Sequence, residues 1–141
     1  TQRDAQFRPS TEAVSEAVAA GGRVVFLASP NNPTGNVLTA GELDALCALP
    51  ALIVVDEAYA EFSETSVVPR LAEFPNLVVL RTFSKWAGLA GLRVGYAVCH
   101  PDLALRMMAI KQPYNVDFKR WAVNYHKDMD LWINTLKQYG R

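Results

Sequence analysis

The sequence predicts an α/β fold in which a mostly parallel sheet is flanked by helices. Short apolar runs alternate along the chain with amphipathic stretches, and this alternation is typical of parallel sheets joined by helical crossovers. The apolar runs are unbroken, as expected of strands that are buried on both faces. A hydrophobic content of 50% with 20% charged residues fits a packed core and excludes a disordered segment.

Three helices are predicted before residue 116 from apolar spacing and capping residues. Residues 10–20 place apolar side chains on one helical face behind a Ser-Thr pair that supplies the N-cap, and a Gly-Gly pair ends the helix. A helix over residues 39–47 opens with Thr39-Ala-Gly-Glu42, which has the form of a capping box. Residues 102–110 have a third helical pattern.

Four short apolar runs are predicted as buried strands, and three of them end in polar residues. The strands are expected over residues 24–27, 52–55, 77–80 and 93–98. Asn32 follows the first, Asp56 the second, and Ser84-Lys85 the third. Because ligands bind beyond the carboxyl ends of the strands in open α/β sheets, these side chains are expected to converge on one crevice.

Each of these residues taken alone has an ordinary structural explanation. Asp56 could cap a helix or a surface turn, and Lys85 could be a solvated ammonium group. A desolvated lysine can instead act as a nucleophile toward carbonyl groups. Thr82, Ser84 and Arg93 offer two hydroxyls and a guanidinium fork, a set of donors that suits a phosphate group but is only moderately specific.

Three motifs that occur in a fixed order carry a resemblance to a known family. They are Ser29-Pro-Asn-Asn-Pro-Thr-Gly35, Val54-Val-Asp-Glu-Ala-Tyr59, and Thr82-Phe-Ser-Lys85 followed by Gly91-Leu-Arg93. Together they resemble the fold-type I pyridoxal-phosphate (PLP) aminotransferases of classes I and II, and within these the histidinol-phosphate aminotransferase group. The phrase Ile110-Lys-Gln-Pro-Tyr-Asn-Val116 strengthens the likeness to that group. The resemblance runs from about Phe7 to Val116.

The resemblance implies PLP as the cofactor and a role for each residue around its ring. Lys85 would form the Schiff base with the cofactor and then move a proton as general acid and base. Asp56 would pair with the protonated ring nitrogen, which keeps the ring an electron sink. Asn32 and Tyr59 would hydrogen-bond the 3-oxygen of the ring.

The phosphate of the cofactor and the substrate have their own implied residues. Ser84 and Arg93 would bind the phosphate, with Thr82 as a weaker candidate. Tyr114 and Asn115 would line the path to the substrate. The implied partners are an amino-acid or amino-phosphate substrate and a keto acid, and the family implies a homodimer.

The resemblance also divides the chain into two parts. Residues 1–116 would form part of the PLP-binding large domain, whose relatives supply a glycine turn and a ring-stacking aromatic residue from an earlier segment. Beyond that domain, apolar side chains at helical spacing predict an appended amphipathic helix over residues 117–141 that packs on the sheet, as in a chimera, with a faint likeness to the final helix of periplasmic solute-binding proteins. Amino-group transfer for histidine biosynthesis is therefore expected to be impaired in this chain. The alternative is a non-enzymatic α/β fragment that keeps its cofactor-binding motifs as relics.

Composition limits the other partners and the compartment. A formal net charge of +0 gives no electrostatic reason to bind nucleic acid or a membrane surface. No apolar run approaches the roughly 20 residues that span a bilayer. Cys47 and Cys99 lack CxxC spacing, which predicts two buried reduced thiols in a cytoplasmic protein. His100 and His126 have no partners at metal-ligand spacing, so no metal is expected.

Overall fold

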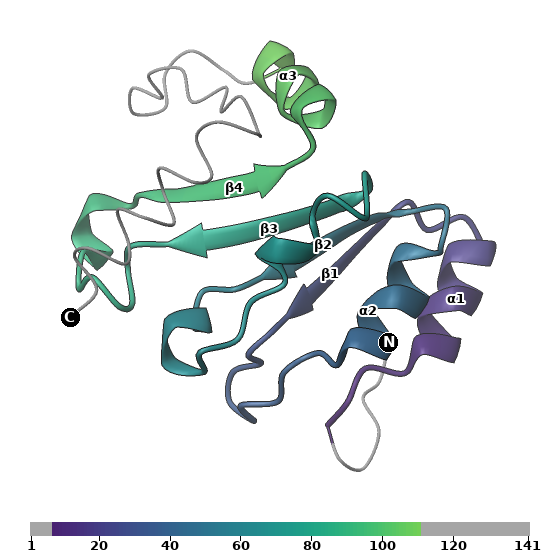
Figure 1. Ribbon diagram of the computed structural model, residues 1–141, viewed down its shortest axis with the longest axis horizontal. Helices are drawn as coiled ribbons and strands as arrows, with labels where there is room; N and C mark the ends of the chain where they lie inside the picture. The colour runs from purple at the N-terminus through teal and green to yellow at the C-terminus, as the bar shows by residue number, and fades with distance from the viewer. Residues whose placement is uncertain (1–6, 111–141) are drawn as a thin grey trace. The chain divides into compact units, whose positions relative to one another are not determined.

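The computed structural model describes residues 7–110 (Figure 1). These residues belong to two compact units, one up to His100 and one from Pro101 onward. The first unit contains a four-stranded sheet in the order β1-β2-β3-β4. The strands are β1 (Val24–Ala28), β2 (Leu52–Asp56), β3 (Leu77–Thr82) and β4 (Gly95–Cys99). The first three are parallel and β4 is antiparallel to β3, which confirms the predicted mostly parallel sheet.

Two helices of this unit begin at the caps that the sequence predicts. Helix α1 (Thr11–Ala19) starts where the Ser10 hydroxyl accepts a hydrogen bond of 3.1 Å from the Ala13 amide. Helix α2 (Ala40–Cys47) starts with a complete capping box. In that box the Thr39 amide donates to the Glu42 carboxylate at 2.7 Å, and the Glu42 amide donates to the Thr39 hydroxyl at 3.3 Å. Both boundaries follow from side chains that satisfy the free amides of a first turn.

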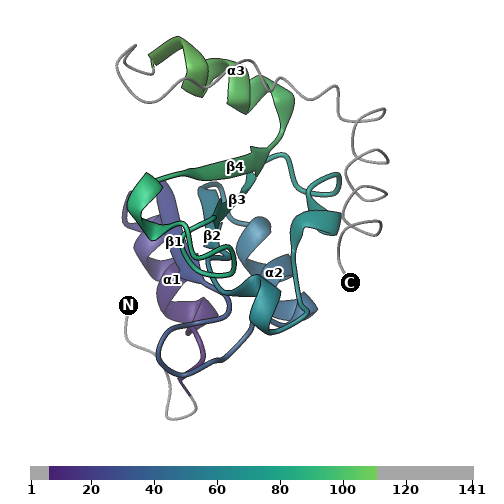
Figure 2. The same ribbon diagram turned by 90° about the vertical axis from the view of Figure 1, so that its left-hand side faces the viewer.

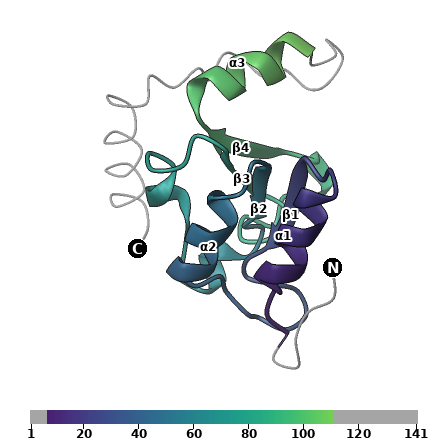
Figure 3. The ribbon, with the colours of Figure 1, turned by 90° about the vertical axis from the view of Figure 1, so that its right-hand side faces the viewer.

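The core lies between these helices and one face of the sheet. Helices α1 and α2 lie side by side on the same face, as the two side views show (Figures 2 and 3). Alternate strand residues point to the same face of a sheet. The buried residues of that face and of the helices are Val14, Val18, Leu27, Leu43, Leu46, Cys47, Ile53, Val55, Leu77 and Val79.

The opposite face is less well covered in the part of the chain that the structure describes. Val24 and Phe26 of β1 are 49% and 70% exposed on it. The prediction that every strand is buried on both faces is therefore wrong for β1, and it is also wrong for β4, none of whose residues is buried. The physical reason is that β1 and β4 are the edge strands of the four-stranded sheet, and each pairs with one neighbour alone.

Shorter elements complete the described residues. The segment between β2 and β3 contains 3₁₀ turns at Ala60–Phe62 and Val68–Arg70, and another turn at Ala90–Leu92 precedes β4. The second unit begins with α3 (Pro101–Ile110), where a helix was predicted. The helix expected over residues 117–141 lies outside the described residues. Among the helices that are described, none combines the length and the apolar character needed to cross a membrane.

The two cysteines are free thiols, in line with the sequence. Cys47 is buried, and this burial raises the pKa of its thiol to about 11. Cys99 is only half-buried, so the prediction of two buried thiols is wrong for this residue. Its position at the end of β4, an edge strand of the four-stranded sheet, accounts for the difference.

Candidate functional site

The loop after β1 holds Asn32 at the surface. The Ser29 hydroxyl accepts a hydrogen bond of 2.9 Å from the Leu38 amide, which ties the two ends of the loop together. The Gly35 amide donates to the Asn31 carbonyl oxygen at 2.7 Å. Gly35 has a φ of +74°, a conformation that residues with a side chain rarely adopt. The loop is therefore shaped by its own hydrogen bonds, and Asn32 is left exposed.

Asp56 and Tyr59 lie in the turn that follows β2. Asp56 is the last residue of that strand and is exposed, and its Oδ1 accepts a hydrogen bond of 3.0 Å from the Ala58 amide. Tyr59 is half-buried. The Nδ2 of Asn32 donates to the Tyr59 hydroxyl at 3.2 Å. This bond joins the loops that follow two adjacent parallel strands.

Lys85 reaches the same place from the end of β3. The Thr82 hydroxyl, at the last position of that strand, accepts from the Ser84 amide at 3.1 Å and lies 3.4 Å from the Val94 carbonyl oxygen. Three residues after Thr82, the Lys85 amine lies 5.1 Å from the centroid of the Tyr59 ring. That distance allows a cation–π contact. Asn32 and Lys85, which the strand-end argument predicts to converge, thus both lie against Tyr59, which the resemblance adds. Among residues 7–110 no hydrogen bond or ion pair joins Asp56 to Asn32 or Lys85, so its part in the convergence stays a prediction.

The predicted phosphate donors are not brought into contact with one another. Arg93 is exposed and has a left-handed backbone conformation, with a φ of 52°. Its Nη1 donates to the Ala90 carbonyl oxygen at 3.3 Å. Ser84 and Thr82 are half-buried, and within residues 7–110 no hydrogen bond joins either of them to the Arg93 guanidinium. Their joint role toward a phosphate stays a prediction.

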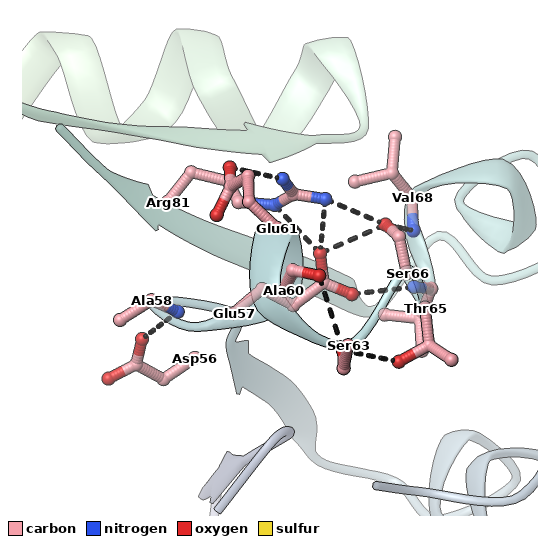
Figure 4. A network of polar contacts seen from close by, with 11 residues as sticks. Asp56, Glu57, Ala58, Ala60, Glu61, Ser63, Thr65, Ser66, Val68 and Arg81 are labelled. Atoms are coloured by element: carbon pink, nitrogen blue, oxygen red, sulfur yellow. Dashed lines mark hydrogen bonds and ion pairs between the residues drawn. The ribbon is translucent and has the colours of Figure 1, made fainter. Parts of the chain in front are cut away.

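A buried ion pair beside the site was not predicted (Figure 4). Glu57 is 1% exposed, and its Oε2 lies 2.8 Å from Nε and 2.7 Å from Nη2 of Arg81. The same oxygen accepts from the Ser66 hydroxyl at 2.9 Å, and Oε1 accepts from the Val67 amide at 2.6 Å. Arg81 also donates to Glu61 at 2.8 Å. Burial by itself lowers the pKa of Arg81, but the carboxylates of Glu57 and Glu61 outweigh it and raise that pKa.

The sequence contained a signal for the burial of Glu57, although not for the identity of its partner. Side chains alternate between the two faces along a strand, so Glu57 continues the fully buried series of Ile53 and Val55. A carboxylate that extends a buried face needs a cationic partner. Arg81 stands at the matching position of the next strand, since Asp56 pairs with Leu80 in the register of β2 and β3.

Fold and site together define a class of protein. A parallel sheet whose successive strand-end loops converge on a lysine, a tyrosine and an asparagine, with an aspartate at the end of the middle strand, is the arrangement expected for the large domain of an aminotransferase. The chain belongs to the aminotransferase class I and II family, whose model matches residues 2–125. This match extends beyond Val116, where the sequence alone suggested that the family pattern ends.

Individual relatives agree with this assignment. The chain is 54% identical over 137 residues to the histidinol-phosphate aminotransferase of Roseiflexus castenholzii, a match that covers 95% of this chain and 37% of that protein. Most of residues 117–141 therefore lie within this match. The chain spans little more than a third of the length of that relative.

Solved structures show the same fold. The histidinol-phosphate aminotransferase from Sinorhizobium meliloti, in complex with pyridoxal-5'-phosphate, is 34% identical with a TM-score of 0.68, over 79% of this chain and 32% of that one. The enzyme of the same name from Clostridium acetobutylicum has a TM-score of 0.72 at 23% identity, over 95% of this chain and 43% of that one. The second likeness supports the fold alone.

Proposed function

We propose that this chain forms the cofactor-anchoring part of a PLP-dependent aminotransferase that acts on histidinol phosphate, with Lys85 as the covalent attachment point. The observation that carries the proposal is the meeting of three strand-end loops, in which Tyr59 receives a hydrogen bond from Asn32 at 3.2 Å and lies 5.1 Å from the Lys85 amine. The named relatives support the choice of cofactor and substrate.

The donors and acceptors at this edge of the sheet fit PLP group by group. The Lys85 amine suits an aldehyde carbon, and the Asp56 carboxylate suits a protonated ring nitrogen. Asn32 and Tyr59 offer an amide and a phenol that could share one ring oxygen. Asp56 is exposed, and among the described residues it accepts one hydrogen bond, from a backbone amide to Oδ1. Its Oδ2 is therefore available to accept a hydrogen bond from a ligand.

The residues of this chain would divide the work in the following way. When bound, PLP supplies an electron sink for the negative charge that develops on the substrate Cα. Asp56 would hold a proton on the ring nitrogen, and Asn32 and Tyr59 would fix the plane of the ring. Lys85 would hold the cofactor and then carry a proton to and from the substrate Cα as general base and acid.

The phosphate of the cofactor would bind at the loop that carries Lys85. Ser84 would donate a hydroxyl hydrogen bond, with Thr82 in a lesser part. Arg93 would contribute its guanidinium fork after exchanging its bond to the Ala90 carbonyl oxygen for two phosphate oxygens, which is a stronger, charge-assisted pairing.

Borohydride reduction of the chain with PLP tests the anchoring role. The lysine amine and the PLP aldehyde condense with loss of water, and borohydride then reduces the new carbon–nitrogen double bond to a stable single bond. The intact mass should therefore rise by one PLP molecule less one oxygen atom. We expect one such addition in the wild type, none in Lys85→Ala and one in Lys111→Ala, which removes an equal charge. Equal labelling of wild type and Lys85→Ala would contradict the proposal.

Amine transfer tests the wider activity. We propose that the whole protein moves an amino group between histidinol phosphate and a keto acid in histidine biosynthesis, as a homodimer. From this chain alone we expect little turnover, because it spans 37% of the length of the Roseiflexus relative and orientation of both reactants supplies much of a catalysed rate. Rapid transfer by the 141-residue chain would show that its residues suffice.

A further inference from the structure

The two consecutive carboxylates at the end of β2 point to opposite faces of the sheet. Asp56 is exposed on the side that the proposed cofactor would occupy, whereas Glu57 is 1% exposed on the helix-covered side. Figure 4 shows Asp56 with its bond to Ala58 on one side of the chain and Glu57 with Arg81 on the other. The two residues share a peptide unit, so any rotation of the strand end that moves one carboxylate also moves the other.

Glu57 is held from three directions. Arg81 binds it from β3, the Ser66 hydroxyl and the Val67 amide bind it from the segment between the strands, and its own amide donates to the Leu80 carbonyl oxygen at 2.9 Å. Ser66 also accepts from Arg81 at 2.9 Å, which closes the network into a ring. No buried polar side-chain atom among residues 7–110 lacks a partner. A buried network that is fully satisfied is rigid, since any displacement would leave a charge unmatched.

This network joins the two strand ends that carry the proposed site. Arg81 lies one residue before the end of β3 and four residues before Lys85. Glu57 lies one residue after Asp56 and two before Tyr59. The Glu57–Arg81 bond therefore fixes the distance between the segment with Asp56 and Tyr59 and the segment with Lys85.

We propose that Glu57 and Arg81 are positioning residues, which set Asp56 and Tyr59 relative to Lys85 from the reverse face of the sheet. The inference rests on the proposed function, because it concerns how well PLP is held. Neither side chain needs to touch the cofactor. Loss of a residue that orients a binding group typically weakens binding of the bound species about tenfold or more. We expect loss of Glu57 or Arg81 to weaken PLP binding by a similar factor.

The first experiment measures the PLP dissociation constant of the full chain. Glu57→Gln keeps the size of the side chain and its hydrogen-bonding oxygen but removes the charge that matches Arg81. We expect it to weaken PLP binding about tenfold. The matched control is Arg70→Gln, which breaks an arginine–glutamate pair of 2.6 Å at the surface and should leave PLP binding unchanged. Unchanged binding in Glu57→Gln would overturn the inference.

A second pair of variants separates positioning from stability. Glu57→Gln combined with Arg81→Met removes both charges of the buried pair, and the Glu61 carboxylate that also loses Arg81 is partly exposed to solvent, so the thermal midpoint should return toward the wild-type value. If the pair positions the site, PLP binding should remain about tenfold weaker in this double variant. Recovery of both the midpoint and the PLP affinity would show a structural role only and would overturn the inference.

Two further measurements distinguish a failure of this inference from a failure of folding or of the proposed function. Ser66→Ala removes the hydroxyl that bridges Glu57 and Arg81 without creating an unmatched charge, so it should fold and weaken PLP binding to a smaller extent. If Glu57→Gln does not fold, Ser66→Ala and the double variant replace it in the measurement of PLP affinity. Wild-type PLP affinity in both of these variants would then overturn the inference. Borohydride labelling of the wild type identifies a different failure, since its absence would overturn the proposed function and this inference together.

Discussion

The two faces of the sheet at the end of β2 hold neighbouring carboxylates in opposite ways. Glu57 is buried, and it accepts hydrogen bonds from Arg81, Ser66 and the Val67 amide. Asp56 is exposed and, among the described residues, accepts a bond from the Ala58 amide alone. The chemistry of the two groups is the same, so the difference comes from their surroundings.

This contrast separates residues that hold the fold from residues that are available to a ligand. A buried carboxylate must have its lone pairs satisfied within the protein, because water cannot reach them. An exposed carboxylate at a strand end can keep lone pairs free at little cost. The end of β2 therefore holds a rigid, fully bonded carboxylate, Glu57, on one face of the sheet and a carboxylate with free lone pairs, Asp56, on the other.

The largest expected effect is on stability and tests the contrast directly. Glu57→Ala leaves the Arg81 guanidinium buried without its main partner, which should cost about 3–5 kcal/mol of unfolding free energy. Asp56→Ala loses one hydrogen bond to a backbone amide and should cost about 1 kcal/mol. Urea unfolding of the two variants measures both values, and similar losses would remove the distinction drawn here.

A glycine opposite the end of β3 gives the next largest effect. A Cβ added at Gly95 would lie 2.7 Å from the Arg81 carbonyl oxygen, so Gly95→Ala must push β4 away from the strand that carries Arg81. We expect a loss of about 1–3 kcal/mol by urea unfolding. Gly91→Ala is the control, since a Cβ there would meet nothing within 4 Å. If both variants are equally stable, the close approach of β4 to β3 is not a constraint.

The Glu42 carboxylate in the capping box of α2 is expected to have an effect on stability between those of Glu57 and Arg70, and this effect should depend on pH. Hydrogen bonds from Arg8 and then Thr39 lower the pKa of Glu42 from its ordinary value of 4.5 to about 2, although burial acts the other way. The folded state thus binds fewer protons than the unfolded state between these values. The contribution of Glu42 is complete above pH 4.5 and is lost as the pH falls toward 2.

Glu42→Gln should remove that part of the acid dependence. The free energy of unfolding, followed from pH 6 down to acid conditions, should fall less steeply below about pH 4.5 in the variant than in the wild type. Thr39→Ala removes the other half of the capping box and should cost about 0.5–2 kcal/mol at neutral pH. Parallel acid profiles of wild type and Glu42→Gln would contradict the assigned pKa.

The smallest effect is expected at the exposed ion pairs. Arg70 bonds to Glu73 at 2.6 Å and to Asp44 at 2.8 Å, distances as short as those in the buried network, but both carboxylates are more than half exposed. Because surface pairs are screened and lose side-chain entropy, Arg70→Gln should leave the thermal midpoint nearly unchanged, and any small change should vanish in high salt. A large loss would mean that bond length matters more than burial.

Much of the fold and part of the site follow from local patterns. The capping box at Thr39 and the strand that ends at Asp56 depend on residues close together in sequence, and both were predicted correctly. The convergence of Asn32 and Lys85 follows from one rule about the carboxyl ends of parallel strands, whereas Tyr59 was expected there only from the family resemblance. The exposure of Phe26 could not be predicted, because it depends on which strand lies at the sheet edge.

The buried network escaped prediction for a related reason. Glu57 stands beside another acid, and Arg81 precedes a polar loop, so both look like surface charges in the sequence. Their pairing depends on the register between β2 and β3, which no local pattern encodes. The same holds for Arg93, whose left-handed backbone turns its side chain toward Ala90 instead of Ser84.

The reversed direction of β4 brings its last residue, Cys99, to the end of the sheet opposite the candidate site. Cys99 pairs with Val78, near the start of β3. The last residue of β4 therefore lies at the opposite end of the strands from Lys85, which follows the last residue of β3. A strand of five residues is about 16 Å long, so a covalent tether from His100 back to the lysine needs at least five extended residues. Short linkers, peptide staples or affinity tags placed directly after His100 would therefore fall short of the anchoring lysine.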